Sequence, residues 1–233
     1  MSRRHLLFLL GAALVILGSI RGGWFLPAIW LGFNFLILGF AHARGWHKIF
    51  GKQADGTISL LGWLFFLPLL IYTLIVWHLI RLFSREPAQN SVTEKLVVGR
   101  RLLKAEINGE FDNIVDLTAE FPEPKVIRYS PAYRDFPILD GAAPAPEALH
   151  RAVASLKPGR VFVHCAQGHG RTGLFALPVL LHLGVAHDVE AGLQMLSLAR
   201  PGIRLSKEQH RCIQIYAAQF AQGIADNPDI VAK

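Results

Sequence analysis

One short stretch of the sequence combines the residue types that can bind and attack a phosphate group. It runs HCAQGHGRTG from His164 to Gly173, with a cysteine and an arginine six positions apart. A buried apolar strand is expected just before it at Val161–His164, and a helix just after it at Gly173–Leu183. In such a strand–loop–helix turn, successive backbone N–H groups and the positive end of the helix face one anion. The glycines let the loop turn tightly and approach a ligand.

Two side chains add reactivity to this turn. The planar guanidinium of Arg171, at the helix start, can hold two oxygens of a phosphate. Cys165 lies at the base of the same turn, where the helix N-terminus and Arg171 should favour its thiolate. A thiolate in this place faces the phosphorus of a bound phosphoryl group and can attack it. The alternative, an ordinary buried cysteine in a glycine-rich turn, does not account for the spacing to Arg171.

The stretch resembles the HCx5R loop, followed by Ser or Thr, of the cysteine-dependent protein tyrosine and dual-specificity phosphatases. The segment ARPGIRLSKEQ, from Ala199 to Gln209, also looks like the sequence that follows the loop's helix in that family. The resemblance covers roughly Val92–Ala221, and the front third of the chain has no part in it. It implies a dual-specificity-phosphatase-like α/β domain with no cofactor.

The resemblance also implies a role for each residue of the loop. Cys165 matches the nucleophile that forms a phosphocysteine, and Arg171 matches the residue that binds phosphate and stabilises the transition state. Thr172 matches the hydroxyl that donates a hydrogen bond to the thiolate, and His164 matches the residue that orients the loop. The residues whose backbone amides match the phosphate cradle are Ala166, Gln167, Gly168, His169, Gly170 and Arg171.

The family also needs a general acid on a separate loop, to protonate the leaving oxygen and later activate water. The proline-rich segment Pro131–Pro146 is expected to be that loop, and it offers Asp135 and Asp140. Asp140 is followed by small residues and then a helix, which fits the family pattern. Asp135 lies 30 residues before Cys165 rather than 25, a more usual distance. We favour Asp140 and keep Asp135 as the alternative.

His169, Cys212 and the remaining histidines are the further candidates for chemistry. Family members that act on lipid phosphates often carry Lys or Arg at the positions of Ala166 and His169, so a protonated His169 could serve an acidic head group. A solvent-facing loop residue is an equal alternative. Cys212 lies in an expected helix and is interpreted as a small buried hydrophobe. The remaining histidines show no metal-ligand spacing with an acidic partner, so we expect no metal.

The back part of the chain predicts a domain with a largely parallel sheet flanked by helices. Residues 92–233 are assigned to this domain, and the polar, proline-containing residues 84–91 to a linker. Besides the strand before Cys165, the expected strands are Lys95–Val98, Asn113–Leu117 and Lys125–Tyr129. The further expected helices are Glu147–Leu156, Val189–Ala199 and Lys207–Ala221.

The front part, residues 1–83, is poor in charge and predicts two to three transmembrane helices. Overall the chain has 52% hydrophobic and only 18% charged residues. The candidate segments are 6–20, 24–43 and 58–82, of which the first is short for a span of about 20 residues. The first could also be a signal peptide, but no cleavage site is followed by a polar mature start. We therefore favour an uncleaved helix in an integral protein of the plasma or inner membrane.

Charge leaves the membrane side open. With three spans, Arg44, Lys48 and Lys52 would draw the second loop inward and leave the catalytic domain outside. Arg81, Arg85 and Lys95 argue for the opposite side, and two spans in place of three would reverse the orientation. A catalytic thiolate survives better in a reducing compartment, which favours the cytosolic side. The net charge of +7 lacks the basic runs of a nucleic-acid-binding protein, so we expect membrane lipids and phosphorylated substrates as partners and no nucleic acid.

These observations predict a membrane-anchored phosphatase acting on phosphoproteins, of the tyrosine or dual-specificity kind. A phospholipid head-group phosphatase, of the phosphatidylglycerophosphate or phosphoinositide type, is the alternative. A non-catalytic phosphate-binding module would require the loss of the cysteine, arginine or acid, and each has a candidate here. A channel or transporter is disfavoured because the apolar segments carry almost no charge.

Overall fold

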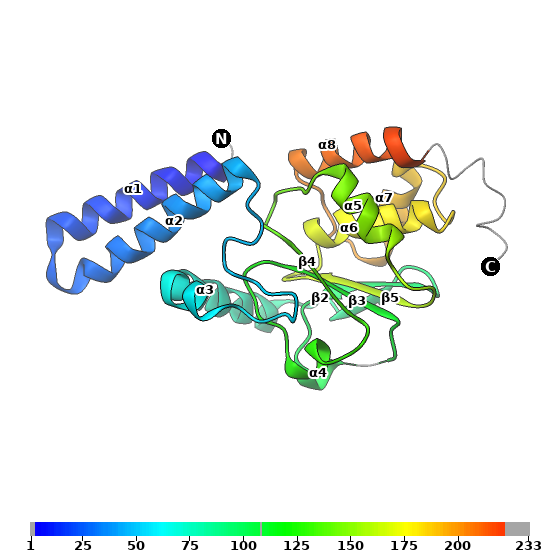
Figure 1. Ribbon diagram of the computed structural model, residues 1–233, viewed down its shortest axis with the longest axis horizontal. Coiled ribbons are helices and arrows are strands. Elements are labelled where there is room, and N and C mark those ends of the chain that lie inside the picture. The colour runs from blue at the N-terminus through cyan, green and yellow to red at the C-terminus, as the bar shows by residue number, and fades with distance from the viewer. Residues whose placement is uncertain (1–2, 108, 222–233) are drawn as a thin grey trace. The chain divides into compact units, whose positions relative to one another are not determined.

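The computed structural model describes residues 3–107 and 109–221, and these divide into two compact units. The first unit contains the chain up to Ser84 together with Ala119–Pro122. The second unit contains Arg85–Thr118 and the chain from Glu123 onward. The helices and strands of both units are labelled in Figure 1.

The first unit is built from long apolar helices. They are α1 (Arg3–Arg21), the 3₁₀ turn η1 (Gly23–Phe25), α2 (Leu26–Arg44) and α3 (Leu60–Phe83). The side chain of Ser59 caps α3 by accepting the Gly62 N–H. Gly45, in the left-handed region with φ 66°, ends α2.

Helices α1 and α2 form a closely packed hairpin (Figure 1). A Cβ added to Gly11 would lie 2.8 Å from the Gly32 carbonyl oxygen, and one added to Gly32 would lie equally close to the Gly11 carbonyl oxygen. Only glycine permits this backbone approach, which is how helices associate in a membrane. In α3, Pro68 interrupts the hydrogen-bond ladder, and the nearby Phe65 carbonyl accepts bonds from Trp30 and Asn34 of α2.

Within the residues that the structure describes, three helices are long and apolar enough to cross a membrane. They cover Arg4–Arg21, Gly23–Arg44 and Leu60–Phe83. Each agrees with a predicted segment to within a few residues, and the first is longer than its apolar core suggested. The structure is therefore compatible with membrane association through these helices.

A short piece from the back of the sequence belongs to this first unit. Phe121, only 3% exposed, has its ring 5.9 Å from that of Trp77 in α3. Its carbonyl oxygen accepts a hydrogen bond from Lys52 Nζ. Lys52 is thus buried and paired, rather than an exposed loop charge available to orient the chain in a membrane.

The second unit is an α/β domain around a mixed five-stranded sheet. Its strands are β1 (Gln89–Ser91), β2 (Leu96–Arg100), β3 (Asn113–Thr118), β4 (Tyr133–Ile138) and β5 (Val161–Cys165). Their order in the sheet is β1-β2-β5-β3-β4, and every neighbouring pair is parallel except β1 with β2. The prediction of a largely parallel sheet is therefore confirmed, with β5 and its cysteine at the centre.

Helices cover this central strand. They are α4 (Lys125–Arg128), α5 (Pro146–Ala154), α6 (Gly170–His182), α7 (Val189–Ala199) and α8 (Lys207–Tyr216), with a 3₁₀ turn η2 (Lys104–Glu106) and a π-helical turn Ala217–Ala221. Helices α5 to α8 gather on one side of the sheet, and α4 lies on the other (Figure 1). Every residue of α6 from Arg171 to Leu181 is buried, so the helix that follows the cysteine loop is held inside the domain.

Three local expectations differ from the structure. Lys125–Tyr129, expected to be a strand, contains helix α4, because only Ile127 is buried there while Val126 and Tyr129 are exposed. The expected loop Pro131–Pro146 contains strand β4. Gln89–Ser91, at the end of the expected linker, forms β1 and pairs with β2.

Candidate functional site

Cys165 ends the central strand β5, and α6 begins five residues later at Gly170. The thiol is buried, with the residue 3% exposed. The backbone N–H of Gly168 points back at it and donates to Sγ over 3.3 Å. The strand–loop–helix arrangement expected around the cysteine is therefore present, and a loop amide already faces the sulfur.

Gly168 allows the loop to lie directly against strand β2. Its φ is +75°, and a Cβ at this position would come within 2.4 Å of the carbonyl carbon and oxygen of Gly99. Side chains are thus excluded both by conformation and by space. The loop's shape depends on this one glycine more than on its neighbours.

Arg171 lies at the helix start with its side chain only 2% exposed. It donates from a terminal guanidinium nitrogen to the carbonyl oxygen of Ile138 over 3.0 Å. Its Nε lies 3.7 Å from Oδ1 of Asp140, whose side chain is 66% exposed. The arginine therefore ties the loop after β4, and with it an accessible carboxyl group, to the cysteine loop.

The two candidate acids occupy different places. Asp140 follows β4 and lies beside Arg171. Asp135 lies within β4, in register with Asp116 of β3, and is half-buried. Of the two, the structure brings Asp140 to the arginine of the loop.

His164 and Thr172 flank the loop and are both fully buried. The imidazole of His164 stacks on Phe162, with the ring centroids 5.2 Å apart. Thr172 Oγ1 makes no hydrogen bond within the part of the chain that the structure describes. Its hydroxyl is thus available to a further partner.

A buried polar cluster surrounds His164. One atom each of Asp116, Glu123 and His164 lie within 4.8 Å of one another, a grouping that could reach a single metal ion. However, Asp116 accepts hydrogen bonds from Thr118 and Tyr133, and Glu123 accepts one from Arg101. Since these donors engage both carboxylate oxygens of Asp116 and Oε1 of Glu123, we interpret the cluster as an internal hydrogen-bond network and assign no metal to it. Burial and the nearby Asp116 raise the pKa of Tyr133, which keeps its hydroxyl a donor.

Two residues around the loop were missed by the sequence analysis. Arg200, 1% exposed, donates from Nε to the carbonyl oxygen of Gly168 and from a terminal nitrogen to that of Gln167, both over 2.9 Å. Glu86 lies 2.7 Å from Nε2 of His169 and 3.1 Å from Arg200. Arg200 falls in the segment that resembles the phosphatase family, but Glu86 falls in the expected linker and had no sequence signal. His169, for which a solvent-facing position was one of two equal alternatives, is half-buried and paired with Glu86.

The second cysteine has a structural role. Cys212 is 5% exposed, and its thiol lies 3.3 Å from the carbonyl oxygen of Pro144 as a donor. Burial, with the charge of Glu147, raises its pKa to about 11. The prediction that Cys212 is buried is confirmed.

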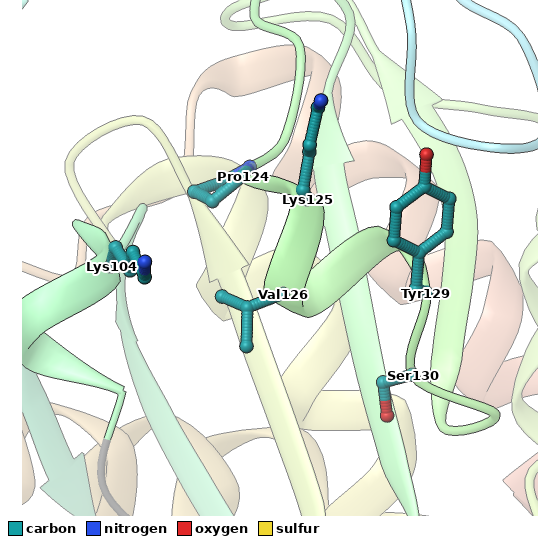
Figure 2. Close-up of a pocket in the computed structure, with 6 residues that line it drawn as sticks. All are labelled: Lys104, Pro124, Lys125, Val126, Tyr129 and Ser130. Carbon is teal, nitrogen blue, oxygen red and sulfur yellow. The ribbon is translucent and has the colours of Figure 1, made fainter.

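A separate depression of about 720 Å³ lies beside α4. Figure 2 shows the residues that line it, which are Lys104, Pro124, Lys125, Val126, Tyr129 and Ser130. None of them belongs to the loop between Cys165 and Arg171, so this depression is not the cysteine site.

Comparisons with known proteins agree with this geometry. Residues 85–191 match the model of the tyrosine phosphatase family, a stretch that includes the cysteine loop and begins inside the expected linker. Among solved structures, Tk-PTP in its active form matches with a TM-score of 0.51 at 21% identity, over 57% of this chain and 99% of that one. The second unit has a tyrosine phosphatase fold.

A second solved structure leads to the same fold. A mouse protein described as a dual specificity phosphatase, complexed with zinc tungstate, matches with a TM-score of 0.50 at 19% identity. That match covers 60% of this chain and 94% of the mouse chain. No curated protein sequence matches the chain.

Proposed function

We propose that the chain is a membrane-anchored phosphatase that hydrolyses phosphomonoesters through a phosphocysteine intermediate. One observation carries this proposal. The Cys165 sulfur lies at the end of the central strand, receives the Gly168 N–H, and shares a short loop with the buried guanidinium of Arg171. The match of residues 85–191 to the tyrosine phosphatase family supports the same chemistry.

In the first step, the Cys165 thiolate attacks the phosphorus of the bound monoester. The sulfur–phosphorus bond forms while the bond from phosphorus to the leaving oxygen breaks. Protonated Asp140 donates its proton to that oxygen, so that the product leaves as a neutral alcohol or phenol. Arg171 and the loop amides stabilise the charge on the remaining phosphoryl oxygens.

In the second step, water attacks the phosphocysteine. The Asp140 carboxylate takes a proton from that water, the sulfur–phosphorus bond breaks, and inorganic phosphate leaves. The hydroxyl of Thr172, buried and without a hydrogen bond in the described residues, donates to the departing sulfur. Side chains and water carry out both steps, so the mechanism includes neither cofactor nor metal.

Phosphoproteins, with phosphotyrosine first and phosphoserine or phosphothreonine next, are the proposed substrates. The second candidate is the head group of a phospholipid monoester. It is favoured by the three helices, found in the described part of the chain, that are long and apolar enough to cross a bilayer. We place the catalytic unit on the cytosolic side, which protease treatment of sealed, oriented vesicles would test.

Phosphate release by the full chain in detergent and in vesicles tests the proposal. The substrates are an aryl phosphate, a phosphotyrosine peptide, a phosphoserine peptide, and vesicles that contain a phospholipid monoester. Cys165→Ser should abolish release, and acid quenching should trap radiolabelled phosphate on the wild-type chain but not on this variant.

Asp140→Asn and the matched variant Asp135→Asn separate the two candidate acids. Loss of a general acid lowers kcat by about 10²–10⁴-fold. We expect this loss for Asp140→Asn, least with an aryl phosphate whose leaving group needs no proton. A larger loss for Asp135→Asn would transfer the role to Asp135. A folded, reduced chain that binds phosphate but releases none from any substrate would instead be a phosphate-binding module.

A further inference from the structure

The guanidinium of Arg200 holds the backbone of the cysteine loop from behind. It binds the carbonyl oxygens of Gln167 and Gly168, two successive peptide groups of the loop. In a trans peptide the C=O and the following N–H point in opposite directions. The Gln167 carbonyl turned toward Arg200 therefore turns the Gly168 N–H away from it, and this is the N–H that donates to Cys165 Sγ.

Arg200 is itself held by the short segment that follows α3. The guanidinium donates to the Pro87 carbonyl oxygen over 2.8 Å and to Oδ1 of Asn90 over 2.6 Å. It also lies 3.1 Å from the Glu86 carboxylate. Three of the five residues from 86 to 90 therefore bind this one side chain, and the segment ends in β1, which pairs with β2.

Glu86 makes a second contact with the loop through His169. Its Oε2 lies 2.7 Å from His169 Nε2. Burial raises the pKa of Glu86, but the hydrogen bond with His169 and the charge of Arg200 outweigh burial and lower it overall. A Cβ at Gly202 would lie 2.3 Å from His169 Nε2 and 2.6 Å from Glu86 Oε1, so a glycine is required where these groups meet.

We infer that Glu86 and Arg200 are positioning residues for the cysteine loop, and that the segment Glu86–Asn90 is part of its support. Glu86 and the neighbouring carbonyl and amide groups fix Arg200, and Arg200 fixes the Gln167 and Gly168 peptides that aim an N–H at the Cys165 sulfur. The residues that join the candidate membrane helix α3 to the second unit therefore control the reactivity of Cys165. This inference rests on the proposed function for its kinetic consequence, but not for its effect on the thiol.

Glu86→Ala, Glu86→Gln and Arg200→Lys test the inference in the full chain in detergent. Glu94→Gln is the matched control, because Glu94 is an exposed carboxylate that follows this segment closely in the sequence. The first readout is the alkylation rate of Cys165 at neutral pH, followed by mass spectrometry. Since a hydrogen bond to sulfur favours the reactive thiolate, we expect Glu86→Ala and Arg200→Lys to slow alkylation by about tenfold or more. Glutamine still accepts hydrogen bonds, so Glu86→Gln should restore part of the rate, and Glu94→Gln should match wild type.

The second readout is the kinetics of aryl phosphate hydrolysis, with circular dichroism to show that each variant is folded. Mispositioned transition-state donors should lower kcat by about tenfold or more for Glu86→Ala, with a smaller change in KM. Wild-type alkylation rates in folded Glu86→Ala and Arg200→Lys would overturn the inference. If the wild-type chain hydrolyses nothing while these variants still slow alkylation, the proposed function fails and the positioning role stands.

Discussion

Replacing Gly168 with alanine should distort the cysteine loop and destabilise the second unit. The left-handed conformation, φ +75°, costs an alanine about 1–2 kcal/mol. The new Cβ would also lie 2.4 Å from the carbonyl carbon of Gly99 and 2.7 Å from Arg100 N, backbone atoms that cannot rotate away. Such overpacking costs about 1–3 kcal/mol more. The total of about 2–5 kcal/mol lowers the Tm by roughly 6–15 °C, at about 3 °C for each kcal/mol.

Gly109→Ala is the matched control in the same unit. Gly109 also has a positive φ of +91°, but its Cβ would first meet the flexible end of the Arg160 side chain at 3.3 Å. Only the conformational cost of about 1–2 kcal/mol should remain, which is a fall in Tm of roughly 3–6 °C.

Thermal unfolding of the full chain, with and without orthovanadate as a phosphate-shaped anion, provides the assay. An anion at 100 times its Kd stabilises the folded state by about 2.7 kcal/mol. Wild type and Gly109→Ala should show this stabilisation. Gly168→Ala should lose most of it, because the backbone amides of the cysteine loop would no longer converge on the anion. If Gly168→Ala unfolds at the temperature of Gly109→Ala and gains as much from orthovanadate, the reasoning from the close backbone approach is wrong.

Three further predictions follow from single contacts. Arg171→Lys should lower kcat/KM for an aryl phosphate by about 10²–10³-fold, because lysine lacks the planar fork that lets one nitrogen donate to the Ile138 carbonyl while others hold the phosphate; near-normal kinetics would contradict this. Cys165 should be alkylated at pH 8 at least about tenfold faster than Cys212, because Cys212 is buried and its pKa of about 11 keeps it protonated. Mass spectrometry of the folded chain measures the ratio of the two rates, and equal rates would contradict the assignment. The pKa of Glu86 is lower in the folded state than its ordinary value of 4.5. Ionised Glu86 should therefore stabilise the folded state at pH values above 4.5, and this stabilisation should be lost as the pH falls through the pKa of the folded state. Glu86→Gln should therefore flatten the fall in Tm below pH 4.5, measured against Glu94→Gln, and an unchanged acid profile would contradict it.

The sequence predicted the cysteine loop because its parts are contiguous. A strand, a glycine-containing turn and a helix start lie within a dozen residues, so spacing alone indicated which groups meet. Asp140 could be placed near Arg171 only through the family resemblance. Ile138, whose carbonyl oxygen accepts a hydrogen bond from Arg171, was expected in a loop. Arg200 and Glu86 are 114 positions apart in the sequence, and no local pattern indicates that they converge on the same loop.

The errors in secondary structure have related causes. Strand β4 contains Pro137 and the charged pair Arg134 and Asp135, which argue against a strand in the middle of a sheet. β4 lies at the edge of the sheet, where one side of the backbone needs no partner strand and proline is tolerated. Helix α4 is only four residues long and has β-branched residues, so local propensity favoured a strand and the tertiary environment decided otherwise.

The division of the chain into units bears on how the protein can be dissected. Ala119–Pro122 belongs to the first unit although it is flanked on both sides by the second, so the chain passes between the units three times. No single cut separates them. A fragment that starts at Ser84 would lack both Trp77 and Lys52, and it would expose Phe121, whose ring and carbonyl group these residues cover. The apolar front is therefore not an interchangeable extension, and exchanging it for another segment would require a redesigned surface around Phe121.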